Sequence, residues 1–261
     1  AELGAKNKIF TTYIGQGWYD TCTPAVIQRT VFENASWDTS YTPYQAEISQ
    51  GRLEALFNYQ ILIKRITKME MANACLLDEA TAAAEAMLMA FRAHNFHRKT
   101  LLLLNSVYVN TKLVVESTAM EVGIKVVKVD KIDNELVNSL KDDLIGFIGQ
   151  TPDTFGFLHD YSDAIKAVQA VGGLGIIGTD LLACVLCKTP GEMGADVTYG
   201  NGQRFGTPMG YGGPHAAFFA TKMTHLRRMP GRIISVAPDA HGNPAYRLAV
   251  QTREQHIRRE I

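Results

Sequence analysis

The sequence Thr100-Leu-Leu-Leu-Leu104 decides the fold of this chain. An uncharged apolar run of this length predicts a strand that is buried on both faces, as strands are in parallel sheets. The alanine-rich stretch Glu79 to Ala93 before it predicts a helix, and Asp78 can cap that helix. The stretch Thr111 to Val122 after it predicts another helix. A strand enclosed between two helices is the repeating unit of an α/β fold.

The same alternation extends in both directions along the chain. We expect further strands at residues 124–129, 144–149, 174–178, 195–199 and 216–221. We expect further helices at residues 23–33, with Thr23 as N-cap and Pro24 as first residue, and at 47–68, 134–140 and 161–171. These elements predict a mostly parallel sheet with helices on both faces and functional loops at the carboxyl ends of its strands. The expected division is an N-terminal arm and first helix at 1–45, the α/β domain at 46–230, and the start of a further lobe at 231–261.

The composition excludes several classes of protein. Of 261 residues, 46% are hydrophobic and 20% are charged, which is typical of a globular domain. Lysine plus arginine and aspartate plus glutamate number 26 each, so no excess charge attracts nucleic acid or an anionic membrane. No apolar run approaches the ~20 residues of a membrane span, and Ala1 to Phe10 lacks the apolar core of a signal peptide.

The cysteines indicate little chemistry. Cys184 and Cys187 form a C-x-x-C pair, which suits a redox or zinc site, but no second pair lies at ligand spacing. Because the pair lies in an apolar stretch, we favour buried free thiols in a reducing compartment and expect no metal.

A second informative stretch is Tyr41-Thr-Pro-Tyr-Gln-Ala-Glu47, at the start of the helix predicted from residue 47. Pro43 fixes its own φ and pushes the preceding residue toward extended geometry, which makes a stiff corner. The corner presents polar side chains of Tyr41, Thr42, Tyr44, Gln45 and Glu47. The alternative is an ordinary helix entry whose tyrosines cover an edge of the core.

Several stretches occur in the order of one known family. They are Tyr13 to Asp20, Tyr41 to Gln60, Asn73 to Met87, Gly191 to Asp196, Gln203 to Ala217 and Gln251 to Arg259. Together they resemble the glycine decarboxylase family, the pyridoxal-phosphate-dependent P-protein of the glycine cleavage system. The resemblance is to its N-terminal half, or to its first subunit where the enzyme is split, and it implies a partial chain.

The resemblance implies an aspartate-aminotransferase-like domain of fold type I. That fold holds pyridoxal phosphate with a lysine for the Schiff base, a carboxylate at the pyridine nitrogen, and a helix N-terminus at the phosphate. Asp180 follows the strand at 174–178, where the carboxylate belongs, although a turn aspartate is an equally good interpretation. The place of the lysine holds Gln203 and Arg204, and a guanidinium cannot act as an amine nucleophile.

The helix expected to receive the phosphate begins with Asp78 and Glu79. Two carboxylates repel a dianion, so we expect both residues to act as caps instead. We therefore expect this half to lack a working cofactor pocket, with pyridoxal phosphate bound mainly by the other half or subunit.

This half could still complete an active site in its neighbour, because paired domains of this fold finish each other's sites. The corner residues could bind a phosphate or the glycine carboxylate across the interface. The glycine-rich loop Gly206 to His215 is expected to bring its backbone close to a neighbouring group. His215 could be a base or a stacking partner, and the alternative is a hydrogen-bonded histidine at the start of a strand. The tail residues Arg253, His256, Arg258 and Arg259 could bind a carboxylate, although a solvated helix is the default interpretation.

The resemblance implies decarboxylation of glycine and transfer of its aminomethyl group to the lipoyl group of H-protein. The expected partners are the C-terminal half or second subunit, lipoylated H-protein and glycine. Two alternatives stay open: a self-sufficient pyridoxal enzyme of the same fold, and a non-catalytic subunit for assembly or regulation. The expected location is the cytoplasm in a bacterium and the mitochondrial matrix in a eukaryote.

Overall fold

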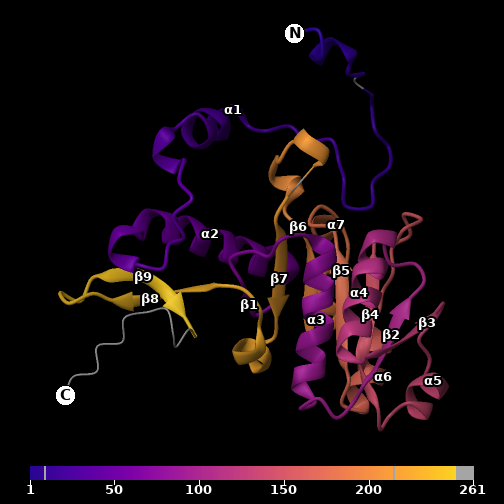
Figure 1. Ribbon diagram of the computed structural model, residues 1–261. Coiled ribbons are helices and arrows are strands. Elements are labelled where there is room, and N and C mark those ends of the chain that lie inside the picture. The colour runs from indigo at the N-terminus through magenta and orange to yellow at the C-terminus, as the bar shows by residue number, and fades with distance from the viewer. Residues whose placement is uncertain (9, 214, 251–261) are drawn as a thin grey trace.

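The centre of the protein is a seven-stranded sheet (Figure 1), seen in a computed structural model that describes residues 1–8, 10–213 and 215–250. The strands are β1 (Met71–Ala72), β2 (Thr100–Leu104), β3 (Lys125–Val129), β4 (Leu144–Thr151), β5 (Leu174–Thr179), β6 (Val197–Asn201) and β7 (Ala217–Thr221). Their order is β1-β7-β6-β5-β4-β2-β3. The strands β3, β2, β4, β5 and β6 run parallel to one another. β7 pairs antiparallel with β6, and β1 pairs antiparallel with β7. The predicted mostly parallel sheet is confirmed.

Helices cover both faces of the sheet. The α-helices of the described chain are α1 (Ala25–Ile27), α2 (Gln50–Thr67), α3 (Glu79–Ala93), α4 (Val109–Val122), α5 (Asn134–Ser139), α6 (Ser162–Ala170), α7 (Ala183–Leu186) and α8 (Pro190–Met193). α1 takes no part in covering the sheet, since it buries no residue. The chain moves from β2 to β3 through α4, and then in the opposite direction to β4 and β5 through α5 and α6. Right-handed crossovers therefore place α4 on one face and α5 and α6 on the other. None of the described helices is long and apolar enough to cross a membrane.

The core lies on both faces of the sheet, against α3 and α4 on one face and against α5 and α6 on the other. All residues of β2, β4, β5, β6 and β7 are buried, which agrees with the apolar sequence of β2 and includes polar residues in β4 and β6. The alanines of α3 are largely buried, and small side chains let this helix contact β4, β5, β6 and β7 closely. Asp78 caps α3 as predicted, because its carboxylate accepts a hydrogen bond of 2.8 Å from the N–H of Thr81. This cap fixes the start of α3 at the carboxyl edge of the sheet.

The N-terminal region differs from the sequence prediction. The helix predicted at 23–33 is α1 followed by a π turn at Gln28–Phe32, and Thr23 is not its N-cap. The Thr23 hydroxyl instead donates to the carbonyl of Gly206 at 2.6 Å. The helix predicted from residue 47 begins at Gln50, because Ala46–Ile48 forms a separate 3-10 turn.

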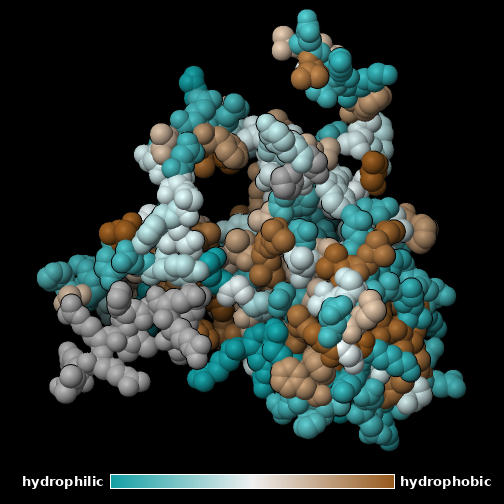
Figure 2. All heavy atoms as spheres, in the orientation of Figure 1, coloured by the Kyte–Doolittle hydropathy of each residue, from teal (hydrophilic) through white to brown (hydrophobic). Residues whose placement is uncertain are grey.

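Residues 1–8 and 10–14 extend away from the sheet (Figure 1), whereas residues 15–23 lie across its carboxyl edge. Apolar side chains on this arm, such as Leu3, Phe10 and Ile14, are exposed, and brown spheres mark apolar residues there in Figure 2. α1 and the π turn that follows it also bury no residue. This region therefore makes little core with the rest of the described chain.

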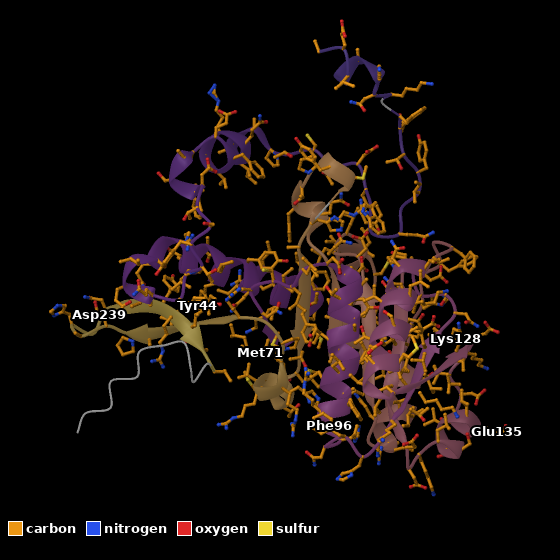
Figure 3. All side chains as sticks on the ribbon, in the orientation of Figure 1. Tyr44, Met71, Phe96, Lys128, Glu135 and Asp239 are labelled. Carbon is orange, nitrogen blue, oxygen red and sulfur yellow. The ribbon has the colours of Figure 1, made fainter. Side chains whose placement is uncertain are left out.

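A two-stranded hairpin, β8 (Ile233–Pro238) and β9 (Pro244–Ala249), follows the sheet, and the sequence prediction missed it. It packs against α2 through a small apolar cluster that includes Leu53, Ile234 and Leu248. At its turn the carboxylate of Asp239 (Figure 3) accepts 2.8 Å hydrogen bonds from the N–H groups of His241 and Asn243. Within the described residues, the stretch predicted to begin a further lobe at 231–261 forms this hairpin against α2, and the lobe itself stays a prediction.

Candidate functional site

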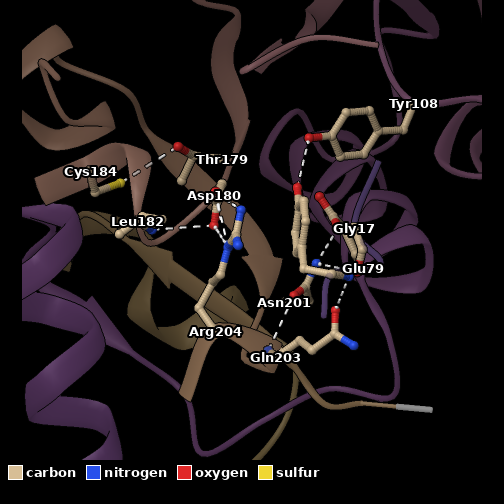
Figure 4. A network of polar contacts seen from close by, with 11 residues as sticks. Gly17, Glu79, Tyr108, Thr179, Asp180, Leu182, Cys184, Asn201, Gln203 and Arg204 are labelled. Carbon is tan, nitrogen blue, oxygen red and sulfur yellow. Dashed lines mark hydrogen bonds and ion pairs between the residues drawn. The ribbon is translucent and has the colours of Figure 1, made fainter. Parts of the chain in front are cut away.

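A polar cluster lies at the carboxyl edge of the sheet (Figure 4). It consists of Gly17, Tyr19, Glu79, Tyr108, Asp180, Asn201, Gln203 and Arg204. Asp180 directly follows β5, Asn201 ends β6, and Glu79 begins α3. The carboxyl ends of parallel strands are where this class of sheet carries its functional loops. The structure therefore brings together four residues that the sequence nominated as a cofactor pocket, Glu79, Asp180, Gln203 and Arg204, whereas the fifth, Asp78, caps α3 beside them.

Asp180 and Arg204 form a bidentate ion pair. The Arg204 Nε donates to Asp180 Oδ1 at 3.0 Å, and Nη2 donates to Oδ2 at 2.9 Å. The side chain of Arg204 is 26% exposed, and that of Asp180 is 9% exposed. Partial burial lowers the pKa of Arg204, but hydrogen bonding to Asp180 and its charge raise it more, so the net pKa is above its ordinary value. The carboxylate nominated for a pyridine nitrogen is thus already bound to a permanent cation.

Tyr19 covers this ion pair. The guanidinium carbon of Arg204 lies 3.6 Å from the centre of the Tyr19 ring, a close cation–π contact. The backbone N–H of Tyr19 donates to Gln203 Oε1 at 2.8 Å, and its hydroxyl lies 3.4 Å from that of Tyr108. Burial raises the pKa of Tyr19, so its phenol stays neutral. The N-terminal segment is therefore bound across the carboxyl edge.

Glu79 points into the cluster, and the prediction that it acts as a cap is wrong. Only 8% of the residue is exposed, and its Oε2 accepts a 2.7 Å hydrogen bond from Asn201 Nδ2. Burial raises the pKa of Glu79 to about 7; the Asn201 bond opposes this effect and the charge of Asp180 adds to it. Gly17 has φ of 94°, and a Cβ there would lie 2.9 Å from Glu79 Oε2, so only glycine lets the segment approach so closely.

His215 lies beside this cluster. It lines a cavity of about 230 Å³ together with Trp18, Asp78 and Glu79. Its Nδ1 lies 2.5 Å from the carbonyl oxygen of Gly213, and its ring meets that of Trp18 edge-on at 6.2 Å. The imidazole is therefore satisfied locally by backbone, as the alternative interpretation expected, although it still faces the cavity.

The corner residues form a separate group on the α2 side. The Tyr41 hydroxyl donates to Gln45 Oε1 at 2.7 Å, and the Arg52 guanidinium donates to the Tyr41 carbonyl. The carbonyl of Thr42 accepts from the N–H of Tyr44 at 2.8 Å. Glu47 is exposed. Within this chain the corner does not line the cavities at the polar cluster.

Tyr44 is fixed by a residue that the sequence did not nominate. Arg232 Nη2 donates to the Tyr44 hydroxyl at 2.7 Å, and the guanidinium lies 5.0 Å from the centre of the ring. Figure 3 shows Tyr44 beside the β8–β9 hairpin. Arg232 and Tyr44 are 188 positions apart, so no local pattern could have linked them.

The polar cluster does not fit pyridoxal phosphate. No lysine lines either of two cavities at this edge, one beside Glu79 and His215 and one beside Asp180 and Arg204. The nearest lysines in sequence are paired elsewhere, Lys188 with Asp160 at 3.0 Å and Lys222 with Asp196 at 2.6 Å. A buried carboxylate at the start of α3 opposes a phosphate, and a guanidinium already binds Asp180. We therefore derive no reaction step from this cluster.

Of the remaining sequence candidates, the structure describes the cysteines but not the tail residues. Cys184 is buried and Cys187 half-buried; both are free, and the Cys184 sulfur lies 3.5 Å from the Thr179 hydroxyl. Across residues 1–8, 10–213 and 215–250, no group of three or more His, Cys, Asp or Glu side chains is placed to hold a metal. The tail residues Arg253, His256, Arg258 and Arg259 lie outside the described residues.

The sheet order and the aspartate after β5 define a domain of the fold-type-I class. A crystal structure of cystathionine gamma synthase from Xanthomonas oryzae pv. oryzae matches with a TM-score of 0.51 at 12% identity, over 67% of this chain and 44% of that one, which supports the fold alone. A crystal structure of glycine decarboxylase (P-protein) of the glycine cleavage system matches with a TM-score of 0.89 at 34% identity, over 99% of this chain and 59% of that one.

Sequence comparison identifies the family. A family model described as Glycine cleavage system P-protein matches residues 1–261. Glycine dehydrogenase (decarboxylating) of Rhodopseudomonas palustris (strain BisA53) is 50% identical over 260 residues, and that of Vibrio cholerae serotype O1 is 54% identical over 254. The chain therefore belongs to the glycine cleavage system P-protein family, as the resemblance implied. It spans 27% and 26% of the length of these two relatives, and 100% and 97% of its own length is matched.

Proposed function

We propose that this chain is the N-terminal part of a glycine dehydrogenase (decarboxylating). The observation that carries the proposal is the family match over the whole chain at about half identity. In the complete enzyme, pyridoxal phosphate supplies the electron sink for loss of CO2 from glycine, and the aminomethyl group passes to the lipoyl group of H-protein. The cofactor is bound by a lysine-bearing part of the enzyme, because the polar cluster of this chain does not fit it.

The role proposed for this part is to complete the active site of that neighbour. The corner residues Tyr41, Thr42, Tyr44, Gln45 and Glu47 are the proposed contacts to a phosphate or to the glycine carboxylate. Their support is a combination of exposure and rigidity: Tyr41 is 44% exposed yet is held by Gln45 and Arg52, while Arg232 fixes Tyr44. Side chains that are ordered without being buried suit a site that another domain closes. His215 is proposed as a further contact, because it faces a cavity at the carboxyl edge.

The two alternatives are less well supported. A self-sufficient pyridoxal enzyme needs a lysine near Asp180, and that place is taken by Arg204. A role in assembly or regulation alone does not account for the ordered polar side chains of the corner. The proposed compartment follows from the source of the protein, the cytoplasm in a bacterium and the mitochondrial matrix in a eukaryote.

Reconstitution tests the proposal. This chain, its complementing C-terminal part, and both together are mixed with pyridoxal phosphate, glycine and lipoylated H-protein, and CO2 release is measured. We expect activity only from the combination, and no Schiff-base absorbance or borohydride-fixed label on this chain alone. A yellow, borohydride-labelled preparation of this chain alone would contradict the proposal, as would a combination that binds the cofactor but releases no CO2 from glycine.

A further inference from the structure

The polar cluster does not fit pyridoxal phosphate because side chains of the chain itself already occupy the groups that would bind the cofactor. The cofactor presents three features to a protein of this fold: a cationic pyridine nitrogen, an aromatic ring, and a phosphate anion at a helix N-terminus. In this chain a cation binds the aspartate after β5, an aromatic ring stacks on that cation, and an acidic group begins α3. All three belong to the chain itself.

The cation is the guanidinium of Arg204. It binds Asp180, the residue after β5, with hydrogen bonds of 3.0 and 2.9 Å. Asp180 is only 9% exposed at its side chain, and a carboxylate that is so buried needs a positive partner. A protonated pyridine nitrogen would supply that partner in a cofactor-binding domain, and Arg204 supplies it here.

The aromatic ring is that of Tyr19. It stacks at 3.6 Å on the guanidinium and thus lies against the ion pair from the side of the N-terminal segment. Its hydroxyl approaches that of Tyr108, which is 5% exposed and immediately precedes α4. Tyr19 therefore takes up space between the end of β5 and the start of α4.

The acidic group is Glu79, the first residue of α3. A carboxylate at this end of a helix interacts favourably with the helix dipole, as a phosphate does. Asn201, at the end of β6, donates to it at 2.7 Å and also donates to the carbonyl of Gly17 at 3.3 Å. The acidic group is thus tied to the same N-terminal segment that carries Tyr19.

We propose that Arg204, Tyr19 and Glu79 together are a side-chain substitute for pyridoxal phosphate, which occupies the binding partners of the inherited cofactor site and closes it to the cofactor. The segment at residues 15–23 holds the substitute in place. Thr21 and Thr23 donate to the carbonyls of Thr207 and Gly206 at 2.8 and 2.6 Å, which binds the segment to the loop after β6. The inference rests on the fold class and the geometry of this cluster, and it holds whatever reaction the complete protein catalyses.

The substitute suits a domain of this fold that has no lysine beside Asp180. An open second site would bind pyridoxal phosphate without a lysine to use it. A site whose aspartate is already neutralised by its own chain should bind free cofactor poorly, because binding would have to break the Asp180–Arg204 pair and displace the segment at residues 15–23.

Titration of the complete holoprotein with pyridoxine 5′-phosphate tests the substitute, since this compound has the ring and the phosphate but no aldehyde to react with a lysine. Calorimetry should detect no added site in the wild type. The triple variant Tyr19→Gly, Arg204→Gly, Glu79→Ser should gain one site per chain and bind at least 10-fold more tightly than a control variant. The control is Arg227→Gly, Glu135→Ser, which changes exposed residues away from the cluster.

Two outcomes of the titration would overturn the inference. One is an added site in the wild type, and the other is a folded triple variant that binds no better than the control. Should the triple variant not fold, amide hydrogen exchange of Arg204→Gln decides. Exchange in residues 15–23 should become at least 10-fold faster than in the exposed-site control Arg227→Gln, and unchanged exchange would overturn the inference. None of these measurements uses glycine turnover, so they stay separate from the test of the proposed function.

Discussion

The charge of Glu79 should make the stability of α3 depend on pH, and Glu79→Gln tests this. The variant keeps an oxygen that can accept from Asn201 but cannot ionise. Burial raises the pKa of Glu79 from 4.5 to about 7 in the folded protein. The folded state therefore keeps a proton that the unfolded state releases. The contribution of Glu79 to the free energy of unfolding is greatest below pH 4.5. It decreases as the pH rises and is completely lost above about pH 7.

The magnitude follows from the separation of the two pKa values. At 1.36 kcal/mol for each unit, the full loss is roughly 3 kcal/mol, of which about 2 to 3 kcal/mol falls between pH 5 and pH 8. Glu79→Gln removes this loss, so the variant should gain stability relative to the wild type as the pH rises. In hydrogen exchange, the ratio of variant to wild-type protection at the buried amides of α3 should increase by roughly 50-fold from pH 5 to pH 8.

The matched control is Glu85→Gln on the same helix, where the carboxylate is 38% exposed and lies 3.5 Å from Arg92. Its protection ratio should stay within about 2-fold over the same range, because a surface ion pair contributes little. A Glu79→Gln ratio that does not change between pH 5 and pH 8 would refute the reasoning, since Glu79 would then ionise as readily in the folded protein as in the unfolded chain.

Three further experiments test the polar cluster and the corner. Gly17→Ala should lower the free energy of unfolding by about 1 to 3 kcal/mol, because φ is 94° and the new Cβ would meet a carboxylate oxygen 2.9 Å away; a denaturant melt with unchanged midpoint would contradict this. Asp180→Asn should lower the free energy of unfolding by about 2 to 3 kcal/mol, a figure reduced for the partial exposure of Arg204. Adding Arg204→Gln should restore part of this loss in a double-mutant cycle, and strictly additive losses would exclude coupling between the two side chains. Tyr44→Phe in the complete enzyme should lower glycine turnover while the circular dichroism spectrum stays the same, and unchanged kinetics would rule out its proposed role.

The elements with strong local patterns could be predicted from the sequence. β2 was predicted at its observed bounds, and α3 with its Asp78 cap also agrees, because apolar continuity and capping are properties of neighbouring residues. The β8–β9 hairpin was missed, since its strands are only partly buried and its packing partner α2 is far away in the sequence.

The composition of the polar cluster was predictable only in part. The absence of an amine at Gln203 and Arg204 could be seen from residue types. The stacking of Tyr19 on Arg204 could not, because it joins residues 185 positions apart through a fold that no short pattern specifies. Glu79 was misjudged because helix N-termini favour acidic residues, whereas the side chain turns inward toward Asn201, more than a hundred positions later.

The short helical region at residues 25–32 has one more consequence. Val26 and Phe32 are 65% and 59% exposed, and the whole region buries nothing on its own chain. Hydrophobic side chains left in water draw copies of a molecule together. A preparation of these 261 residues by themselves should therefore scatter light increasingly as it is concentrated, and polar replacements at Val26 and Phe32 should keep it clear.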